Sequence, residues 1–167
     1  SFLVDESVLA TILDAAELSP TDTVLEVGPG LGILTGALAQ RAGRVIAVEI
    51  EPRLAAHLRK SLAIFPNVQV VEGDILNLPE VPEPPGGYPP YKVVANIPYA
   101  ITSAILRHFL EAPTPPTRLV VMVQKEVAQR IVAAPGHLSL LAISVQFYGD
   151  AQLMAVIPAR SFYPVPQ

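Results

Sequence analysis

Short apolar runs alternate along the chain with longer segments whose apolar residues recur at helical spacing. A short apolar run bounded by turn residues is typical of a buried strand, and apolar positions three and four apart indicate a helix with one buried face. The runs predict strands over residues 23–27, 44–49, 68–72, 91–95, 118–124 and 153–157. The amphipathic segments predict helices over residues 9–16, 31–42, 52–64 and 102–110, and two more that begin near 125 and 138.

This alternation predicts one α/β domain over residues 1–167, with a mostly parallel sheet covered by helices on both faces. Proline-rich stretches at 79–90 and 113–116 separate some of the elements, and we interpret them as loops because proline lacks a backbone donor. Ligands bind such sheets beyond the carboxyl ends of the strands. Polar residues at those ends are therefore the candidates for function.

Composition excludes several classes of protein. The chain has no cysteine, which rules out a disulfide framework, a thiolate metal site and a cysteine nucleophile. Its apolar runs are far shorter than the ~20 residues of a membrane span, and no basic-then-apolar signal peptide opens it, so we expect a cytoplasmic protein without a membrane partner. A net charge of −4 argues mildly against a large nucleic-acid surface, because nucleic-acid-binding domains are usually basic.

A glycine-rich turn follows the first strand and begins at Glu26. Glycines at 28, 30 and 32 allow a tight turn and the close approach of a ligand. The spacing is G-x-G-x-G, whereas the dinucleotide fingerprint is G-x-G-x-x-G. Taken alone, the motif is also compatible with an ordinary strand-to-helix turn.

Acidic residues end the next two strands. Glu49 ends the second strand, where a carboxylate can accept hydrogen bonds from both hydroxyls of a ribose. Asp74 follows the third strand and can accept from an exocyclic amine, with Ile75 flanking an adenine ring, although an aspartate here can also simply cap a turn. We interpret Glu51 as an acid at a helix start. Three consecutive strand ends with a glycine turn or an acid favour a ligand site.

The fourth strand ends in Asn96-Ile-Pro-Tyr99. An asparagine carbonyl and a backbone carbonyl can accept both hydrogens of an exocyclic amine and turn its lone pair toward an electrophile. Pro98 fixes the backbone beside that carbonyl, and Tyr99 can stack on a base. These residue types suit amino-methylation of a purine.

The arrangement resembles class I S-adenosylmethionine-dependent methyltransferases with a Rossmann-like sheet. The resemblance implies that Glu26 and the glycines from Gly28 to Gly32 lie at the methionine portion of the cofactor, Glu49 at the ribose, and Asp74 at the adenine amine. A nicotinamide-dependent dehydrogenase is the weaker alternative, because the glycine spacing differs and no catalytic Tyr-Lys or His pair is evident.

Three further segments are similar to the ribosomal RNA adenine dimethyltransferases. These are Phe2-Leu3-Val-Asp5, Met122-Val-Gln-Lys-Glu-Val-Ala-Gln-Arg130 and Phe162-Tyr-Pro-Val-Pro166. The middle segment resembles the small-subunit (16S-type) enzymes more than the macrolide-resistance enzymes that act on 23S rRNA. The resemblance implies cofactor contacts from Ser1, Leu3 and Asn96, and an adenine stacked between Tyr99 and Phe162.

The resemblance implies dimethylation of N6 of adenosines in small-subunit rRNA during ribosome biogenesis, with the small-subunit precursor as partner and the protein a monomer without metal. The alternatives are a macrolide-resistance 23S rRNA methyltransferase and a non-catalytic, cofactor-binding assembly factor. The family continues with one more strand and a small helical domain, so we interpret this chain as the catalytic domain only. Four arginines could neutralise phosphates: Arg107, Arg118, Arg130 and Arg160.

Overall fold

The computed structural model describes residues 2–78 and 90–165, apart from the side chain of Tyr99. The strands are β1 (Phe2–Leu3), β2 (Thr23–Val27), β3 (Arg44–Glu49), β4 (Val68–Glu72), β5 (Tyr91–Asn96), β6 (Arg118–Met122) and β7 (Phe162–Tyr163). The helices are α1 (Glu6–Ala16), α2 (Ile33–Ala39), α3 (Pro52–Ser61), α4 (Thr102–Leu110), α5 (Lys125–Ile131) and α6 (Leu140–Gln146), with short 3₁₀ helices η1 (Tyr99–Ile101) and η2 (Ala159–Ser161).

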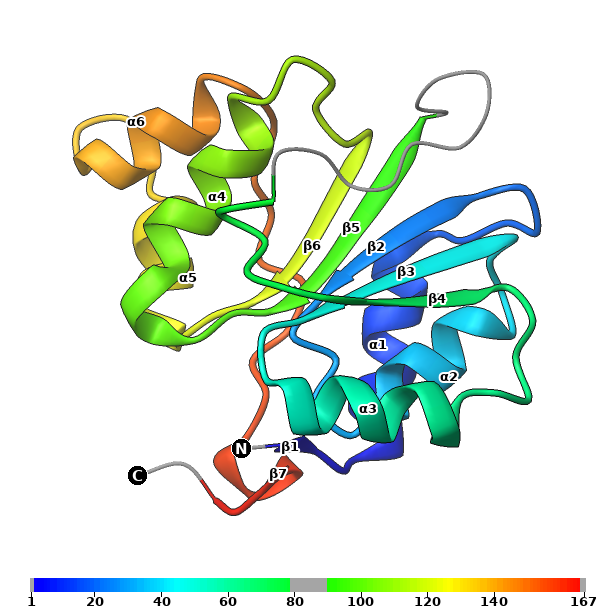
Figure 1. Ribbon diagram of the computed structural model, residues 1–167. Coiled ribbons are helices and arrows are strands. Elements are labelled where there is room, and N and C mark those ends of the chain that lie inside the picture. Colours follow the sequence, from blue (N-terminus) through cyan, green and yellow to red (C-terminus); the bar gives the residue numbers. More distant parts are fainter. Residues whose placement is uncertain (1, 79–89, 166–167) are drawn as a thin grey trace.

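Five strands form a parallel sheet in the order β4-β3-β2-β5-β6. Helices α1, α2 and α3 lie on one side of this sheet, and α4, α5 and α6 lie on the other (Figure 1). The predicted parallel sheet with helices on both faces is therefore confirmed. Because all five strands are parallel, the carboxyl ends of β2, β3, β4 and β5 lie at the same edge of the sheet, and β2 is the central strand.

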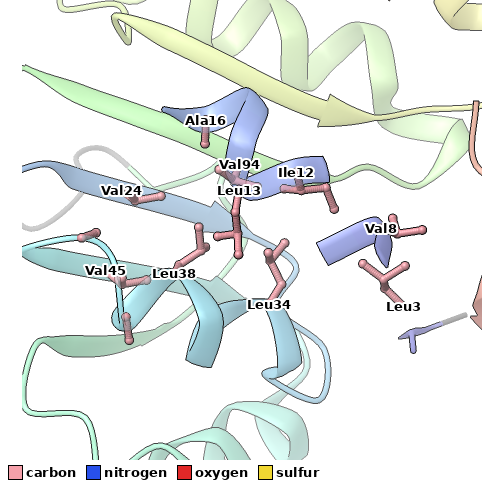
Figure 2. Packing of buried hydrophobic residues seen from close by; sticks show 12 residues of the cluster. Leu3, Val8, Ile12, Leu13, Ala16, Val24, Leu34, Leu38, Val45 and Val94 are labelled. Carbon is pink, nitrogen blue, oxygen red and sulfur yellow. The ribbon is translucent and has the colours of Figure 1, made fainter. Parts of the chain in front are cut away.

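Alternate residues of the strands fill two cores. Val24, Val45 and Val94 pack against the apolar faces of α1 and α2, as Figure 2 shows. Their neighbours in sequence face the opposite side, where Ile105 and Phe109 of α4 complete a second cluster. The period of two thus gives the inner strands β2, β3 and β5 two buried faces, as expected for a parallel sheet.

Several helices are shorter than predicted, because capping residues set where they begin or end. The helix predicted over 31–42 covers only α2, because Gly32 adopts φ +84° and is its N-cap. Helix α3 begins at Pro52, as predicted, but ends at Ser61 rather than near 64. Helix α6 begins at Leu140 because the side chain of Ser139 caps it. Asp5 is the N-cap of α1, and its side chain accepts from the N–H of Ser7.

The strand predicted over residues 153–157 is wrong. Residues 151–158 form neither helix nor strand. This segment lies along a groove of about 690 Å³ beside β6, whose other lining residues include Val120, Met122 and Phe162. An apolar run becomes a strand only when a neighbouring strand satisfies its backbone groups, and within the described part of the chain none pairs with this segment.

An unpredicted two-stranded sheet joins the ends of the chain. Strand β1 pairs antiparallel with β7, so that Phe2 lies opposite Tyr163 and Leu3 opposite Phe162. Both strands have only two residues, which is too short for any hydrophobic period to be recognised in the sequence. The pairing brings the opening segment and the proline-rich segment, which the resemblance treats separately, into one unit.

Candidate active site

The glycine turn after β2 is the centre of the site. Gly28, Gly30 and Gly32 all have positive φ, from +59° to +84°, which explains why glycine occupies each position. The backbone N–H of Gly28 donates to the carbonyl of Val48 on β3 at 3.0 Å. A Cβ added at Gly28 would lie 3.7 Å from the carbonyl oxygen of Asn96 on β5. The turn therefore lies between the ends of both neighbouring strands.

Glu49 anchors this turn from the end of β3. Its Oε2 accepts a hydrogen bond from the N–H of Gly30 at 3.2 Å, and its Oε1 accepts from the N–H of Glu51 at 2.9 Å. Only 5% of Glu49 is exposed. A carboxylate has about four lone-pair sites, so Glu49 can accept further hydrogen bonds from a ligand. Glu51 itself caps α3 by accepting from the N–H of Arg53, as the sequence predicted for a helix-start acid.

Glu26 is buried beneath the turn, on the face of the sheet that α2 covers. It is 2% exposed, and its Oε2 has no hydrogen-bond partner among the described residues. Burial raises the pKa of its carboxyl from 4.5 to about 7; the nearby Thr35 hydroxyl offsets part of this shift, and the charge of Glu49 adds to it. No hydrogen bond of ordinary geometry joins Glu26 to Thr35. An unpartnered buried carboxyl beside the glycine turn fits a cationic or hydrogen-bonding ligand.

Asp74 forms a turn after β4. Its Oδ1 accepts from the N–H of Leu76 at 3.0 Å and its Oδ2 from the side chain of Asn77 at 2.7 Å. The N–H of Gly73 donates to the carbonyl of Glu49, which joins the ends of β4 and β3. Ile75 is only 4% exposed and packs in the α4-side core, so little of its side chain is left for a ligand. Asp74 thus caps this turn, which is one of the two roles that the sequence allowed. Its carboxylate keeps lone pairs for further hydrogen bonds.

Asn96 is the last residue of β5 and lies opposite Met122 of β6. The next residue, Ile97, is buried and donates its N–H to the Met122 carbonyl at 3.1 Å. The carbonyl of Pro98 already accepts from the N–H of Ile101 and the hydroxyl of Thr102. No described residue donates to the carbonyl of Ile97, which makes this oxygen the better acceptor for a substrate amine.

Two predicted site residues belong to the β1–β7 sheet. Leu3 is 8% exposed and packs in the α1-side core, so any ligand contact would come from its backbone. Phe162 is half-buried against the same core, which is a different cluster from the one that contains Ile75 and Ile97. Ser1 and the side chain of Tyr99 lie outside the described part of the structure.

Phe2 is a site residue that the sequence did not predict. A Cβ on Gly30 would lie 2.8 Å from Cδ1 of Phe2, so the aromatic ring covers this glycine directly. The contact depends on the antiparallel pairing of β1, which the sequence did not predict. Phe2 did appear within a family-like motif, but nothing in its spacing pointed to Gly30.

Two of the four candidate phosphate-binding arginines are already in ion pairs. Arg107 pairs with Glu111 at 3.1 Å and Arg118 with Glu17 at 2.9 Å. Arg130 and Arg160 form no ion pair with any residue in the described ranges. The same ranges contain no helix long and apolar enough to cross a membrane, and no cluster of three or more side chains suited to a metal ion.

A family model described as ribosomal RNA adenine dimethylase matches residues 1–167. The chain belongs to this family. A ribosomal RNA small subunit methyltransferase A of Dehalococcoides mccartyi is 52% identical over 166 residues, covering 99% of this chain and 57% of the relative. A protein of the same name from Moorella thermoacetica is 44% identical over 176 residues, covering 100% of this chain and 61% of the relative. The chain therefore spans less than two thirds of the length of these relatives.

Solved structures of the family share the fold. A dimethyladenosine transferase from Plasmodium falciparum superposes with a TM-score of 0.87 at 30% identity, over 100% of this chain and 60% of that one. The 23S rRNA methyltransferase ErmE superposes with a TM-score of 0.81 at 39% identity, over 100% of this chain and 66% of that one. The predicted class I methyltransferase fold is confirmed.

Proposed function

We propose that this chain methylates the exocyclic N6 amine of adenosines in small-subunit ribosomal RNA, using S-adenosylmethionine. The observation that carries the proposal is the position of Asn96, at the end of β5 and beside Gly28 of the glycine turn. The N–H of Gly28 and the carbonyl of Asn96 lie on neighbouring strand ends. An electrophile held by the turn would thus be next to an amine held by Asn96.

The strand ends also fit the cofactor. The turn carries no side chain at Gly28, Gly30 and Gly32, although Phe2 lies over Gly30, and the unpartnered carboxyl of Glu26 lies beneath it. Glu49 would hold the ribose, and Asp74 the adenine amine. When bound, S-adenosylmethionine supplies a methyl group on a sulfonium sulfur, and transfer of that group to N6 leaves S-adenosylhomocysteine and releases one proton.

Asn96 would orient and activate the substrate amine. The lone pair of an adenine amine is conjugated with the ring, which makes the amine a poor nucleophile. The Asn96 side-chain carbonyl and the Ile97 carbonyl can accept its two hydrogens and turn the lone pair out of the ring plane. The acidity of the amine rises sharply once it is methylated, so no general base is needed. Rate enhancement comes mainly from positioning, with Tyr99 and Phe162 stacking on the base.

The small subunit is the preferred substrate because the curated relatives at 44–52% identity carry that name. The experiment is transfer of a labelled methyl group to under-methylated small subunits, with the modified nucleosides identified by mass. We expect N6-methylated adenosine in small-subunit RNA. Labelling of 23S rRNA alone would instead support the macrolide-resistance activity. Cofactor binding without transfer to either RNA would support the assembly factor.

A further inference from the structure

One partly buried hydrogen bond connects segments from near the two ends of the chain. The hydroxyl of Ser161 donates to Oδ2 of Asp5 at 2.7 Å, and the N–H of Val4 donates to the carbonyl of Ser161 at 3.0 Å. Ser161 is only 2% exposed. These bonds lie directly beside the β1–β7 pairing, which is on the side of α1 in Figure 1. We call the Asp5–Ser161 hydrogen bond, with the β1–β7 pairing, the clasp.

Asp5 uses its two carboxylate oxygens for different tasks. Oδ1 accepts from the N–H of Ser7 at 2.9 Å and from its hydroxyl at 2.6 Å, which caps α1. Oδ2 accepts from Ser161. Hydrogen bonds from Ser7 and then Ser161 lower the pKa of Asp5 to about 2, so the group is an ionised acceptor on both sides at neutral pH. Loss of Ser161 would therefore disturb the clasp without removing the helix cap.

The clasp positions Phe2 on the glycine turn. Phe2 is paired with Tyr163 in β1–β7, and its ring lies 2.8 Å from the position that a Cβ of Gly30 would take. The N–H of Gly30 in turn donates to Glu49. A continuous series of contacts thus runs from the Asp5–Ser161 bond, through the short sheet and Phe2, to the turn and its anchoring acid.

We propose that Asp5 and Ser161 are positioning residues that hold Phe2 against Gly30 and thereby set the affinity of the glycine turn for the cofactor. This inference rests on the proposed function, since it assumes that the cofactor binds at the turn. When the clasp opens, β1 loses a constraint at its end, Phe2 leaves Gly30, and the turn can rearrange. The cofactor then dissociates faster, while Asn96 and its neighbours on β5 are unaffected.

The test compares S161A with S7A, a matched change at the other oxygen of the same Asp5. Affinity for S-adenosylhomocysteine is measured by calorimetry, and methyl transfer to small subunits at varied S-adenosylmethionine. We expect S161A to lose about tenfold in affinity and to raise KM for the cofactor to a similar extent, with kcat within twofold of the original protein. S7A should change neither the affinity nor the KM, even if its thermal stability falls as much as that of S161A.

Phe2→Ala supplies a second route that does not disturb the buried serine. It should lose affinity to the same degree as S161A, and the F2A/S161A double variant should lose no more than either single variant, because both act through the same ring. Should S161A fail to fold, S161C replaces it, since a thiol fills the space with a weaker donor.

Unchanged affinity in S161A, equal losses in S161A and S7A, or additive losses in the double variant would each overturn the inference. Absence of S-adenosylhomocysteine binding to the original protein is a distinct result. It would contradict the proposed function itself.

Discussion

Two regions of the molecule, the strand ends of the site and the segment beside β6, treat polar and apolar residues in opposite ways. At the ends of β2 and β3 two carboxyl groups are almost fully buried, Glu26 at 2% exposure and Glu49 at 5%. Beside β6, the segment 151–158 leaves apolar side chains in solvent, with Met154 62% and Val156 59% exposed. Burying a carboxyl and exposing large apolar groups are each unfavourable, but they have different causes.

At the strand ends, backbone hydrogen bonds fix the segments that carry the two buried carboxyls. Hydrogen bonds link the glycine turn to β3, and β3 to the turn after β4. Beside β6, the apolar run has no paired neighbour among the described residues. The difference shows that a pattern of residues becomes a strand, or a site, only when tertiary neighbours fix its backbone. Four predictions test this contrast.

The largest effect is expected at Asn96. Asn96→Ala removes the amine acceptor at the end of β5 and should lower the rate of methyl transfer by at least ~10²-fold. Cofactor affinity should remain nearly unchanged, because the turn, Glu49, Asp74 and the backbone carbonyl of residue 96 beside Gly28 are intact. Transfer is measured with labelled cofactor and affinity by calorimetry. Equal loss of both would contradict the role given to Asn96.

Glu26→Gln tests whether the buried carboxyl lowers stability. The folded pKa of about 7 lies above the ordinary 4.5, so the folded state retains a proton that the unfolded state releases between these values. The free energy of unfolding therefore falls as pH rises from about 4.5 to 7. The variant, which is always neutral, should gain on the order of 3 kcal/mol relative to the original at pH 8 and little at pH 4.5. Urea unfolding at both pH values measures this, and a gain independent of pH would refute it.

The same substitution in the two regions should lower the free energy of unfolding by unequal amounts. Val48→Ala removes a buried side chain on β3, which is 2% exposed, and should lower the free energy of unfolding by about 2 kcal/mol. Val156→Ala, beside β6, should cost less than about 0.5 kcal/mol. Denaturant unfolding of both variants gives the difference. Similar costs would mean that the segment 151–158 is packed after all.

Glycine substitutions separate backbone strain from function. Gly30 and Gly136 both have positive φ, but only a Cβ on Gly30 would meet a neighbour, the Phe2 ring. Each alanine variant should lose about 1 kcal/mol in unfolding free energy from strain. Only G30A should also bind S-adenosylhomocysteine more weakly. Loss of affinity in G136A would show that strain alone accounts for the effect.

The sequence predicted most of the regular sheet and the residues at its strand ends. Apolar runs identified β2 to β6, and a glycine turn or an acid marked the ends of β2, β3 and β4. The strand at 153–157 was wrong because local pattern does not report whether a partner strand is present. The contact of Phe2 with Gly30 and the Ser161–Asp5 bond could not be foreseen, since each joins residues far apart in sequence through a sheet of two-residue strands. That Oε2 of Glu26 is buried without a hydrogen-bond partner also follows only from the tertiary fold.

The most direct test of the strand-end site compares two acids that are two residues apart. Glu49 faces the turn, and Glu51 caps α3. Calorimetric titration of S-adenosylhomocysteine into E49A and E51A should show at least about a tenfold loss of affinity for E49A and a change within about twofold for E51A. Equal affinities in the two variants, or a greater loss in E51A, would contradict the site described at these strand ends.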